Sequence, residues 1–370
     1  MSDEIELGYL LAVAAAGVCA PRPLDSWFRA LASPRDIVRH AKHGGVTPSA
    51  AEPLSSEVLR RLAALDDAAA SAALARARAC GAAVLTRRDE RYPAALRERL
   101  VDAPHVLYYR GSPEALQGRS IAIVGSRAAT PYGRHTAAAF ARELGAYDAA
   151  IVSGFARGID AAAHRGALDA AARTVAVLGC GLGALYPQYH AQLGEEILDA
   201  GGALISEFPP DQHALPHHFP MRNRIVAALA EATVVIEAGS KSGALITARL
   251  AVEYGRAVCA VPGDIGRKTS EGTNALIQDG VPLVTCAAEV AALVGWQTVQ
   301  LSARPGEPVD ELIAMLDRNG SAIDELSERG GLDAGTLAAR LTMLEIAGLV
   351  ERKAGGLFAP MRPPRTLLQR

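Results

Sequence analysis

From residue 119 onward, short apolar segments that end in glycine alternate with longer segments of helical periodicity. The segments SIAIVG, AIVSG, TVAVLG, VVIEAG and AVCAVPG are each rich in small or β-branched apolar residues. Apolar strands that are bounded by glycine and separated by helices predict a parallel sheet covered on both faces. We therefore predict an α/β domain with such a sheet, whose core covers residues 119–296.

The remaining chain changes pattern on either side of this core. Residues 1–78 are rich in alanine and leucine with helical periodicity broken by prolines, which predicts several short helices. Residues 79–118 read as a small strand-containing extension, so the whole sheet domain is expected over 79–296. After a proline-containing linker at 297–308, residues 309–362 show the helix–helix–helix–hairpin pattern of a winged helix-turn-helix, followed by a tail at 363–370.

Cationic loops follow several of the predicted strands. Ligands of an open parallel sheet bind at the carboxyl ends of its strands, where small residues leave backbone N–H groups free to face an anion. Lysine is scarce in this chain, with four lysines against 34 arginines, so Lys241 in a glycine-serine loop is unlike its surroundings. Tight turns need glycine in any case, but the cations favour a phosphate-binding interpretation. The residues concerned are Gly125, Ser126, Arg127, Gly154, Arg157, Gly158, Ser240, Lys241, Ser242 and Gly243.

Further polar candidates lie at two predicted helix starts. Arg222, Asn223 and Arg224 are consecutive, so they cannot all share one helix face. They are interpreted as contacts to phosphates or base edges, and the alternative is solvent-exposed salt bridges with Glu231 or Glu207. Asn274 can reach the same cleft, or it can cap its own helix.

Several classes of site are excluded or disfavoured. The glycine turns contain neither GxGxxG with its acidic partner nor GxxxxGK[ST], so no nucleotide cofactor is expected. His213, His217 and His218 lack partners at metal-ligand spacing, and no metal is expected. Asp160 is interpreted as a helix-capping residue, and His164 as a residue of the core or of the surface. The phenylalanines 155, 208 and 219 either stack on unpaired bases or belong to the core.

Net charge and cysteine usage limit which partners and which cellular location the sequence favours. The formal net charge is −2, so a nucleic-acid partner requires positive charge concentrated in one pocket. Five scattered cysteines without CxxC spacing favour reduced thiols and a cytoplasmic location. No membrane insertion and no export are expected.

Taken in order, GSR, SGFARGIDAAAH, VLGCGLGALYP, SEFPP, FPMRNRIVAALA, VVIEAGSKSGALITA, VPGDI and GTNALIQDG resemble the DNA-processing protein A family (DprA, also called Smf). The resemblance implies an extended Rossmann-like domain, an N-terminal SAM-like helical domain and a C-terminal winged helix. It also implies a non-enzymatic protein that binds single-stranded DNA, protects incoming strands in natural transformation, loads the RecA recombinase and forms a homodimer through the Rossmann-like domain.

By position, the resemblance places Arg127, Lys241, Ser242 and Gly243 in a basic DNA pocket flanked by Arg222, Arg224 and Asn274. Two regions depart from the family pattern. The segment AAAGVCAP replaces the glycine hairpin with which helix-hairpin-helix modules bind phosphate. The third predicted helix of the winged domain carries one basic residue, Arg340, so that domain is expected to contact protein or to be an accessory module.

A different class of function stays open on the sequence. The Rossmann-like phosphoribohydrolases of the lysine-decarboxylase-like group also have an early glycine turn and a later glycine-rich loop. Their later loop carries a catalytic glutamate, whereas this chain has AGSKSGALITA with no acid until Glu253. The missing carboxylate disfavours hydrolysis of a nucleotide.

Overall fold

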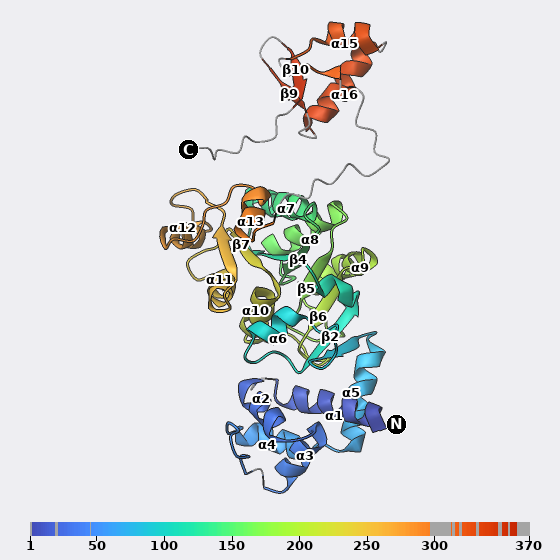
Figure 1. Cartoon of the computed structure of the whole chain (residues 1–370), viewed down its shortest axis with the longest axis vertical. Helices are drawn as coiled ribbons and strands as arrows, with labels where there is room; N and C mark the ends of the chain where they lie inside the picture. The colour runs from blue at the N-terminus through green and yellow to red at the C-terminus, as the bar shows by residue number, and fades with distance from the viewer. Residues whose placement is uncertain are drawn as a thin grey trace. The chain divides into compact units, whose positions relative to one another are not determined.

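The computed structural model describes residues 2–18, 21–44 and 46–296 and, further along the chain, residue 312 and residues 315–317, 320–330, 333–346, 350–353 and 356–360. The chain divides into two compact units, Met1–Val299 and Gln300–Arg370 (Figure 1). The expected linker at 297–308 and the expected tail at 363–370 lie outside the described residues.

An eight-stranded sheet in the order β1-β2-β6-β5-β4-β3-β7-β8 forms the centre of the first unit. From β6 to β8 in this order the strands are parallel, while β1 and β2 extend the sheet antiparallel beside β6. The predicted parallel α/β sheet is confirmed, and the extension at 79–118 supplies the two antiparallel strands. The strands are β1 (Ala83–Thr86), β2 (Val106–Gly111), β3 (Ser120–Gly125), β4 (Ala150–Ser153), β5 (Thr174–Val177), β6 (Ala203–Ser206), β7 (Ala232–Ile236) and β8 (Ala257–Ala260).

The apolar segment VPLVT at residues 281–285 forms no strand of the sheet but only a single bridge, between Ala260 and Leu283. Pro282 has no N–H for a second ladder bond. The next helix also begins soon afterwards, at Ala287.

Helices cover both faces of the sheet because alternate residues of each strand point to opposite sides. In β3, Ile121 and Ile123 pack with α7, α8 and α13, whereas Ala122 and Val124 pack with α6, α10 and α11. The α-helices that follow the first two strands along the chain are α6 (Ala94–Arg99), α7 (Pro131–Gly145), α8 (Ile159–Asp169), α9 (Ala191–Asp199), α10 (His218–Leu229), α11 (Gly243–Glu253), α12 (Glu271–Gln278) and α13 (Ala287–Leu293), of which α6 lies between β1 and β2.

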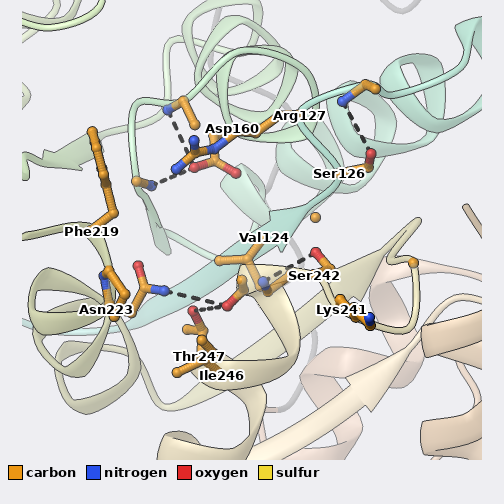
Figure 2. Close-up of a pocket in the computed structure, with 18 of the residues that line it drawn as sticks. Val124, Ser126, Arg127, Asp160, Phe219, Asn223, Lys241, Ser242, Ile246 and Thr247 are labelled. Atoms are coloured by element: carbon orange, nitrogen blue, oxygen red, sulfur yellow. Dashed lines mark hydrogen bonds between the residues drawn. The ribbon is translucent and has the colours of Figure 1, made fainter. Parts of the chain in front are cut away.

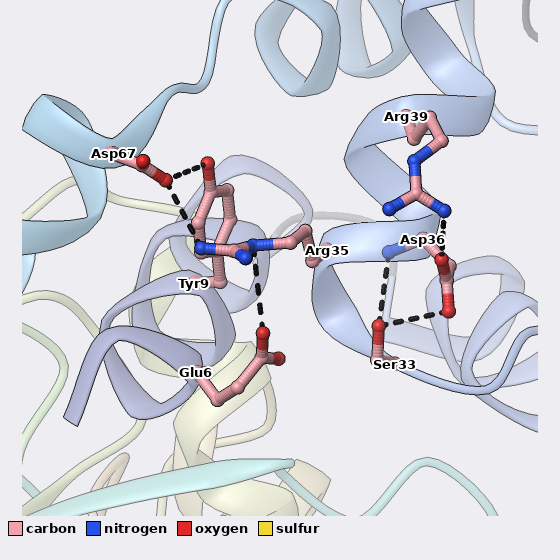
Figure 3. A network of polar contacts seen from close by, with 7 residues as sticks. All are labelled: Glu6, Tyr9, Ser33, Arg35, Asp36, Arg39 and Asp67. Carbon is pink, nitrogen blue, oxygen red and sulfur yellow. Dashed lines mark hydrogen bonds and ion pairs between the residues drawn. The ribbon is translucent and has the colours of Figure 1, made fainter. Parts of the chain in front are cut away.

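The N-terminal segment is helical, as predicted, and has a small core of its own around Trp27. Arg35 ties three of its helices together: the side chain lies 3.5 Å from Glu6, 3.2 Å from Asp67 and 4.9 Å from the ring centroid of Tyr9 (Figure 3). The helices are α1 (Ser2–Ala16), α2 (Pro21–Ala30), α3 (Pro34–Lys42), α4 (Ser56–Ala63) and α5 (Asp67–Ala79).

These helices also pack directly on the sheet. Leu11 of α1 and Ala73 of α5 share one apolar core with Val106 and Tyr108 of β2. The first unit therefore contains the helical segment as well as the sheet.

A buried carboxylate reinforces this junction. Asp25 of α2 pairs with Arg87, with Arg29 at 2.6 Å and with Nε2 of His105 at 3.1 Å. Burial acts to raise the pKa of Asp25, but the hydrogen bonds and charges of His105 and Arg87 outweigh it, so the pKa lies below its usual value.

The second unit is a winged helix, as predicted. It comprises α15 (Ile323–Gly330), α16 (Ala334–Ile346) and the antiparallel pair β9 (Val350–Arg352) and β10 (Phe358–Pro360). Leu326, Leu337, Leu341 and Phe358 form its core. The helix expected first, near residues 309–320, falls mostly outside the described residues.

Candidate nucleic-acid interface

A cleft of about 810 Å³ lies at the carboxyl ends of β3, β4 and β7. From β3 the chain adds β4, β5 and β6 on one side and then β7 and β8 on the other, so the cleft sits where the strand order reverses, which is the usual ligand position in such sheets. Ten of the fourteen residues predicted from the sequence line it: Gly125, Ser126, Arg127, Gly154, Arg222, Asn223, Ser240, Lys241, Ser242 and Gly243.

Two glycines let the turn after β3 lie close to β7 and to the turn after β4. A Cβ on Gly125 would lie 1.8 Å from the carbonyl oxygen of Ile236. Gly158 has a φ of 86°, and a Cβ there would lie 2.3 Å from the carbonyl oxygen of Ser126. At these two positions the fold itself requires glycine.

Arg127 is the exposed cation of the first turn. Its guanidinium carbon lies 4.9 Å from the centroid of the Phe219 ring, a cation–π distance that pairs a phosphate-binding group with an aromatic face. The turn is fixed beneath it, because the N–H of Ser126 donates to the carbonyl of Glu237 at 2.6 Å and the Ser126 hydroxyl accepts from Ala128 at 3.1 Å. In Figure 2, Phe219 and Asn223 lie across the cleft from Lys241.

The second cationic loop leads into α11. Ser242 caps this helix, its hydroxyl accepting from the N–H of Ala244 at 3.3 Å. Gly243 follows as the first helical residue, and a Cβ there would meet nothing within 4 Å. Lys241 is exposed, and a second exposed lysine, Lys268 from the loop after β8, lines the same cleft. A helix N-terminus beside two ammonium groups suits an anion.

Two buried side chains of opposite charge, Arg222 and Asp160, lie at the floor of the cleft. Arg222 is only 3% exposed, and its guanidinium donates to the carbonyls of Gly154 and Val177, which ties the ends of β4 and β5 together. Burial lowers the pKa of Arg222 to about 10, so it stays protonated at neutral pH. Asp160 accepts from the N–H groups of Gly154 at 3.1 Å and Ala156 at 3.3 Å, and burial raises the pKa of this carboxyl while Arg222 acts against the shift.

Arg224 points away from the cleft, in contrast to the sequence-based prediction. It is 6% exposed and forms an ion pair with the buried Glu207, and its Nη1 atom lies 3.9 Å from Asp102. α10 begins at His218, so residues 222–224 occupy its second turn, and successive side chains there point about 100° apart. Arg224 therefore has the alternative partner Glu207, but their ion pair is buried and not solvent-exposed.

Three other predicted residues do not line the cleft either. Arg157 is exposed in the loop before α8, and Gly158 acts by letting the two turns approach. Asn274 lies inside α12, where its amide bonds the backbone of Gly263 at 3.1 Å and 2.9 Å. Asn274 thus fixes the loop after β8.

The sequence left Phe219 undecided and did not single out Lys268. Of the three phenylalanines, Phe155 and Phe208 are fully buried in the core, whereas Phe219 lines the cleft. His164 is a core residue with its Nδ1 atom 2.7 Å from the Thr174 hydroxyl, and burial lowers its pKa to about 3. The scarcity of lysine was the signal that could have found Lys268 as well as Lys241.

Neither a metal site nor a membrane span is found in the described part of the chain. The described residues contain no group of three or more His, Cys, Asp or Glu side chains placed to hold a metal ion. Within the same residues, no helix has both the length and the apolar character needed to cross a membrane.

Fold and cleft together define an open parallel α/β protein with a cationic, partly aromatic ligand site and an additional winged helix. The chain belongs to the DNA recombination-mediator protein A family, whose model matches residues 83–295. The DprA winged helix domain matches residues 298–356. The resemblance noted in the sequence is thereby confirmed.

Individual relatives agree with this assignment. The chain is 38% identical to Protein Smf of Escherichia coli over 267 residues, which cover 69% of this chain and 71% of that protein. It is 41% identical to a putative DNA processing protein DprA of Mycobacterium tuberculosis over 265 residues, 68% of each chain.

Solved structures match as well. The crystal structure of DNA processing protein A from Streptococcus pneumoniae has a TM-score of 0.65 at 32% identity and covers 77% of this chain and 97% of that chain. A Helicobacter pylori DNA processing protein A, described for its single-stranded DNA binding mode, has a TM-score of 0.51 at 31% identity and covers 57% of this chain and 94% of that chain.

Proposed function

We propose that this chain is a non-enzymatic protein that binds single-stranded DNA in the cleft between β3, β4 and β7. The observation that carries the proposal is the convergence of three exposed cations, Arg127, Lys241 and Lys268, from three separate loops around one cleft. Phe219 lies beside Arg127, so a phosphate-binding group and a base-stacking face are adjacent. A single strand, whose bases are unpaired, can use both.

Fluorescence anisotropy with a labelled oligothymidine tests this proposal. We expect Lys241→Ala and Arg127→Ala to weaken binding strongly without lowering the melting temperature, because both side chains are exposed. For each phosphate that a variant no longer neutralises, the slope of log affinity against log salt should become shallower by about 0.7. Lys42→Ala is the matched control, since Lys42 is an exposed lysine at the end of α3. Unchanged binding by both cleft variants would refute the proposed site.

The chemistry of the cleft does not favour a nucleotide hydrolase. Among the described residues, its lining contains two carboxylates, Asp160 and Glu271. An Asp160 oxygen is already held by two backbone N–H groups, so it is not presented as a base. Glu271 is exposed and is the remaining candidate. Release of free base from nucleoside monophosphates by the wild type, abolished in Glu271→Gln, would support hydrolysis instead.

The finer roles that the family resemblance implies also belong to this proposal: protection of incoming strands in natural transformation, loading of RecA, a cytoplasmic location and a homodimer through the Rossmann-like domain. The cleft supports strand protection and RecA loading, because both roles require a site that holds a single strand. Light scattering after size exclusion tests the dimer. RecA filament formation on strands coated with single-stranded-DNA-binding protein, with and without this chain, tests loading.

A further inference from the structure

A second hollow, of about 770 Å³, opens beside the cleft. It is lined by Gly183–Tyr189 together with Ala191, His213 and Ala214. Tyr186 and Tyr189 are 52% and 68% exposed, although apolar side chains of this size usually lose most of their surface on folding. Neither the cleft nor the core of the unit accounts for these two exposed rings.

An aromatic contact links the hollow to the cleft. Tyr186 lies with its ring centroid 5.8 Å from that of Phe219, at an interplanar angle of 53°. Phe219 lines the cleft and contacts Arg127, while Tyr186 lines the hollow, so the contact between the two rings joins the cleft to the hollow. Tyr189 lines the same hollow as Tyr186, so exposed aromatic rings are present beyond the cationic site.

The Tyr189 ring is held by a fixed neighbour. The Tyr189 ring packs edge-on against His190, with centroids 4.6 Å apart. His190 is buried and its Nδ1 atom bonds the carbonyl oxygen of Phe155 at 3.0 Å. Tyr189 thus has a rigid support on one side and remains open on the other.

The lining of the hollow differs from the cleft in charge. Among the described residues, the hollow is lined by no Lys, Arg, Asp or Glu, whereas the cleft is lined by four cationic and two anionic side chains. A phosphate requires cations, while an unpaired base stacks on any exposed aromatic face. The chemistry of the hollow therefore selects bases, with Gln188 and His213 as polar groups beside them.

We propose that a single strand held in the cleft continues past Phe219 onto Tyr186 and Tyr189, which stack two further unpaired bases. This inference rests on the proposed function and extends its site. The affinity gained from the two added bases should depend on the bases and not on the salt concentration, in contrast to binding in the cleft.

The test compares a short oligothymidine with a longer one in an anisotropy titration. We expect the Tyr186→Ala/Tyr189→Ala variant to bind the longer strand about 5- to 150-fold more weakly for each base that no longer stacks, from a stacking free energy of about 1–3 kcal/mol per base. Binding of the short strand and the salt slope should not change. Tyr186→Phe/Tyr189→Phe should bind like the wild type, because phenylalanine retains the stacking face. Tyr132→Ala, at a tyrosine 55% exposed outside both hollows, is the matched control.

A longer strand whose added nucleotides are abasic separates stacking from other interactions. The wild type should bind it no better than the short strand, and the alanine variant should then equal the wild type. Equal affinity of the alanine variant and the wild type for the intact longer strand would overturn the extension, including the case in which the tyrosines contact a protein instead. If the short strand does not bind the wild type at all, or if Lys241→Ala has no effect on it, the cleft proposal fails first.

Discussion

Replacement of Arg224 by methionine should destabilise the first unit without acting on the DNA site. Arg224 and Glu207 are both buried and pair with each other, with Asp102 as a distant second acid at 3.9 Å. Removing one partner of such a pair leaves an uncompensated buried charge, which lowers the free energy of unfolding by about 3–5 kcal/mol. At about 2–4 °C per kcal/mol for a unit of this size class, the melting temperature should fall by roughly 6–20 °C.

The pH dependence of the variant follows from Glu207. In the wild type, burial raises the pKa of Glu207 to about 6, against the effect of Arg224. Without Arg224 the pKa rises further, and a carboxyl whose folded pKa lies above its unfolded value makes the folded state less stable as pH increases. The destabilisation in Arg224→Met should therefore be larger at pH 8 than at pH 6, as measured by circular dichroism melting.

A double variant, Arg224→Met/Glu207→Leu, controls for removal of the charge pair. Replacing both partners by apolar residues is often neutral, so the double variant should melt within a few degrees of the wild type and bind single strands normally. A contrary result would be an Arg224→Met protein that melts like the wild type yet no longer binds DNA. Arg224 would then act on the strand, and the ion pair would be irrelevant to stability.

Three further predictions concern other parts of the first unit. Lys268→Ala should weaken single-strand binding and make the salt slope shallower by about 0.7, as expected for Lys241→Ala. Anisotropy at several salt concentrations measures this effect, and an effect no larger than that of Lys42→Ala would show that Lys268 does not contact the strand. Gly243→Ala should leave the free energy of unfolding equal or raise it by the roughly 0.4–1 kcal/mol of a tolerated Gly→Ala change, because open space surrounds the position. DNA binding should weaken where the strand approaches the backbone, and unaltered binding would place the strand elsewhere. Asp25→Asn should lower the free energy of unfolding at neutral pH by about 1–3 kcal/mol. Because the folded protein holds the pKa of Asp25 below its usual value of 3.8, this destabilisation should shrink as pH falls below 3.8. Urea unfolding at pH 7 and at low pH measures it, and a pH-independent destabilisation would contradict it.

The sequence predicted the sheet well because its signals are local. Except for β6, which leads into Glu207 and Phe208, each core strand is a short apolar run followed closely by glycine. At Gly125 the requirement for glycine arises from the neighbouring strand, because the Ile236 carbonyl occupies the place of a side chain. The position of the cleft followed from the topology rule for parallel sheets. The antiparallel placement of β1 and β2 did not follow, because strand direction beyond a long connection is set by packing.

The sequence could not predict the direction in which each side chain points, and this limited the prediction of the site most. Arg222, Asn223 and Arg224 are neighbours in sequence, yet the first fixes two strand ends, the second lines the cleft and the third pairs with Glu207. Lys268 enters the cleft from a loop after β8, and no local pattern relates it to Lys241. Such convergence depends on the tertiary fold, which spacing along the chain does not specify.

The apolar packing of α1 and α5 on β2 affects how the chain can be divided. A fragment starting at residue 79 would present Val106 and Tyr108 to water, next to the unpaired rim of β1. Unprotected strand rims of this kind promote self-association. We therefore expect such a fragment to precipitate at concentrations where the intact first unit stays dispersed, and deletion studies of the strand-binding site should keep residues 1–78 in place.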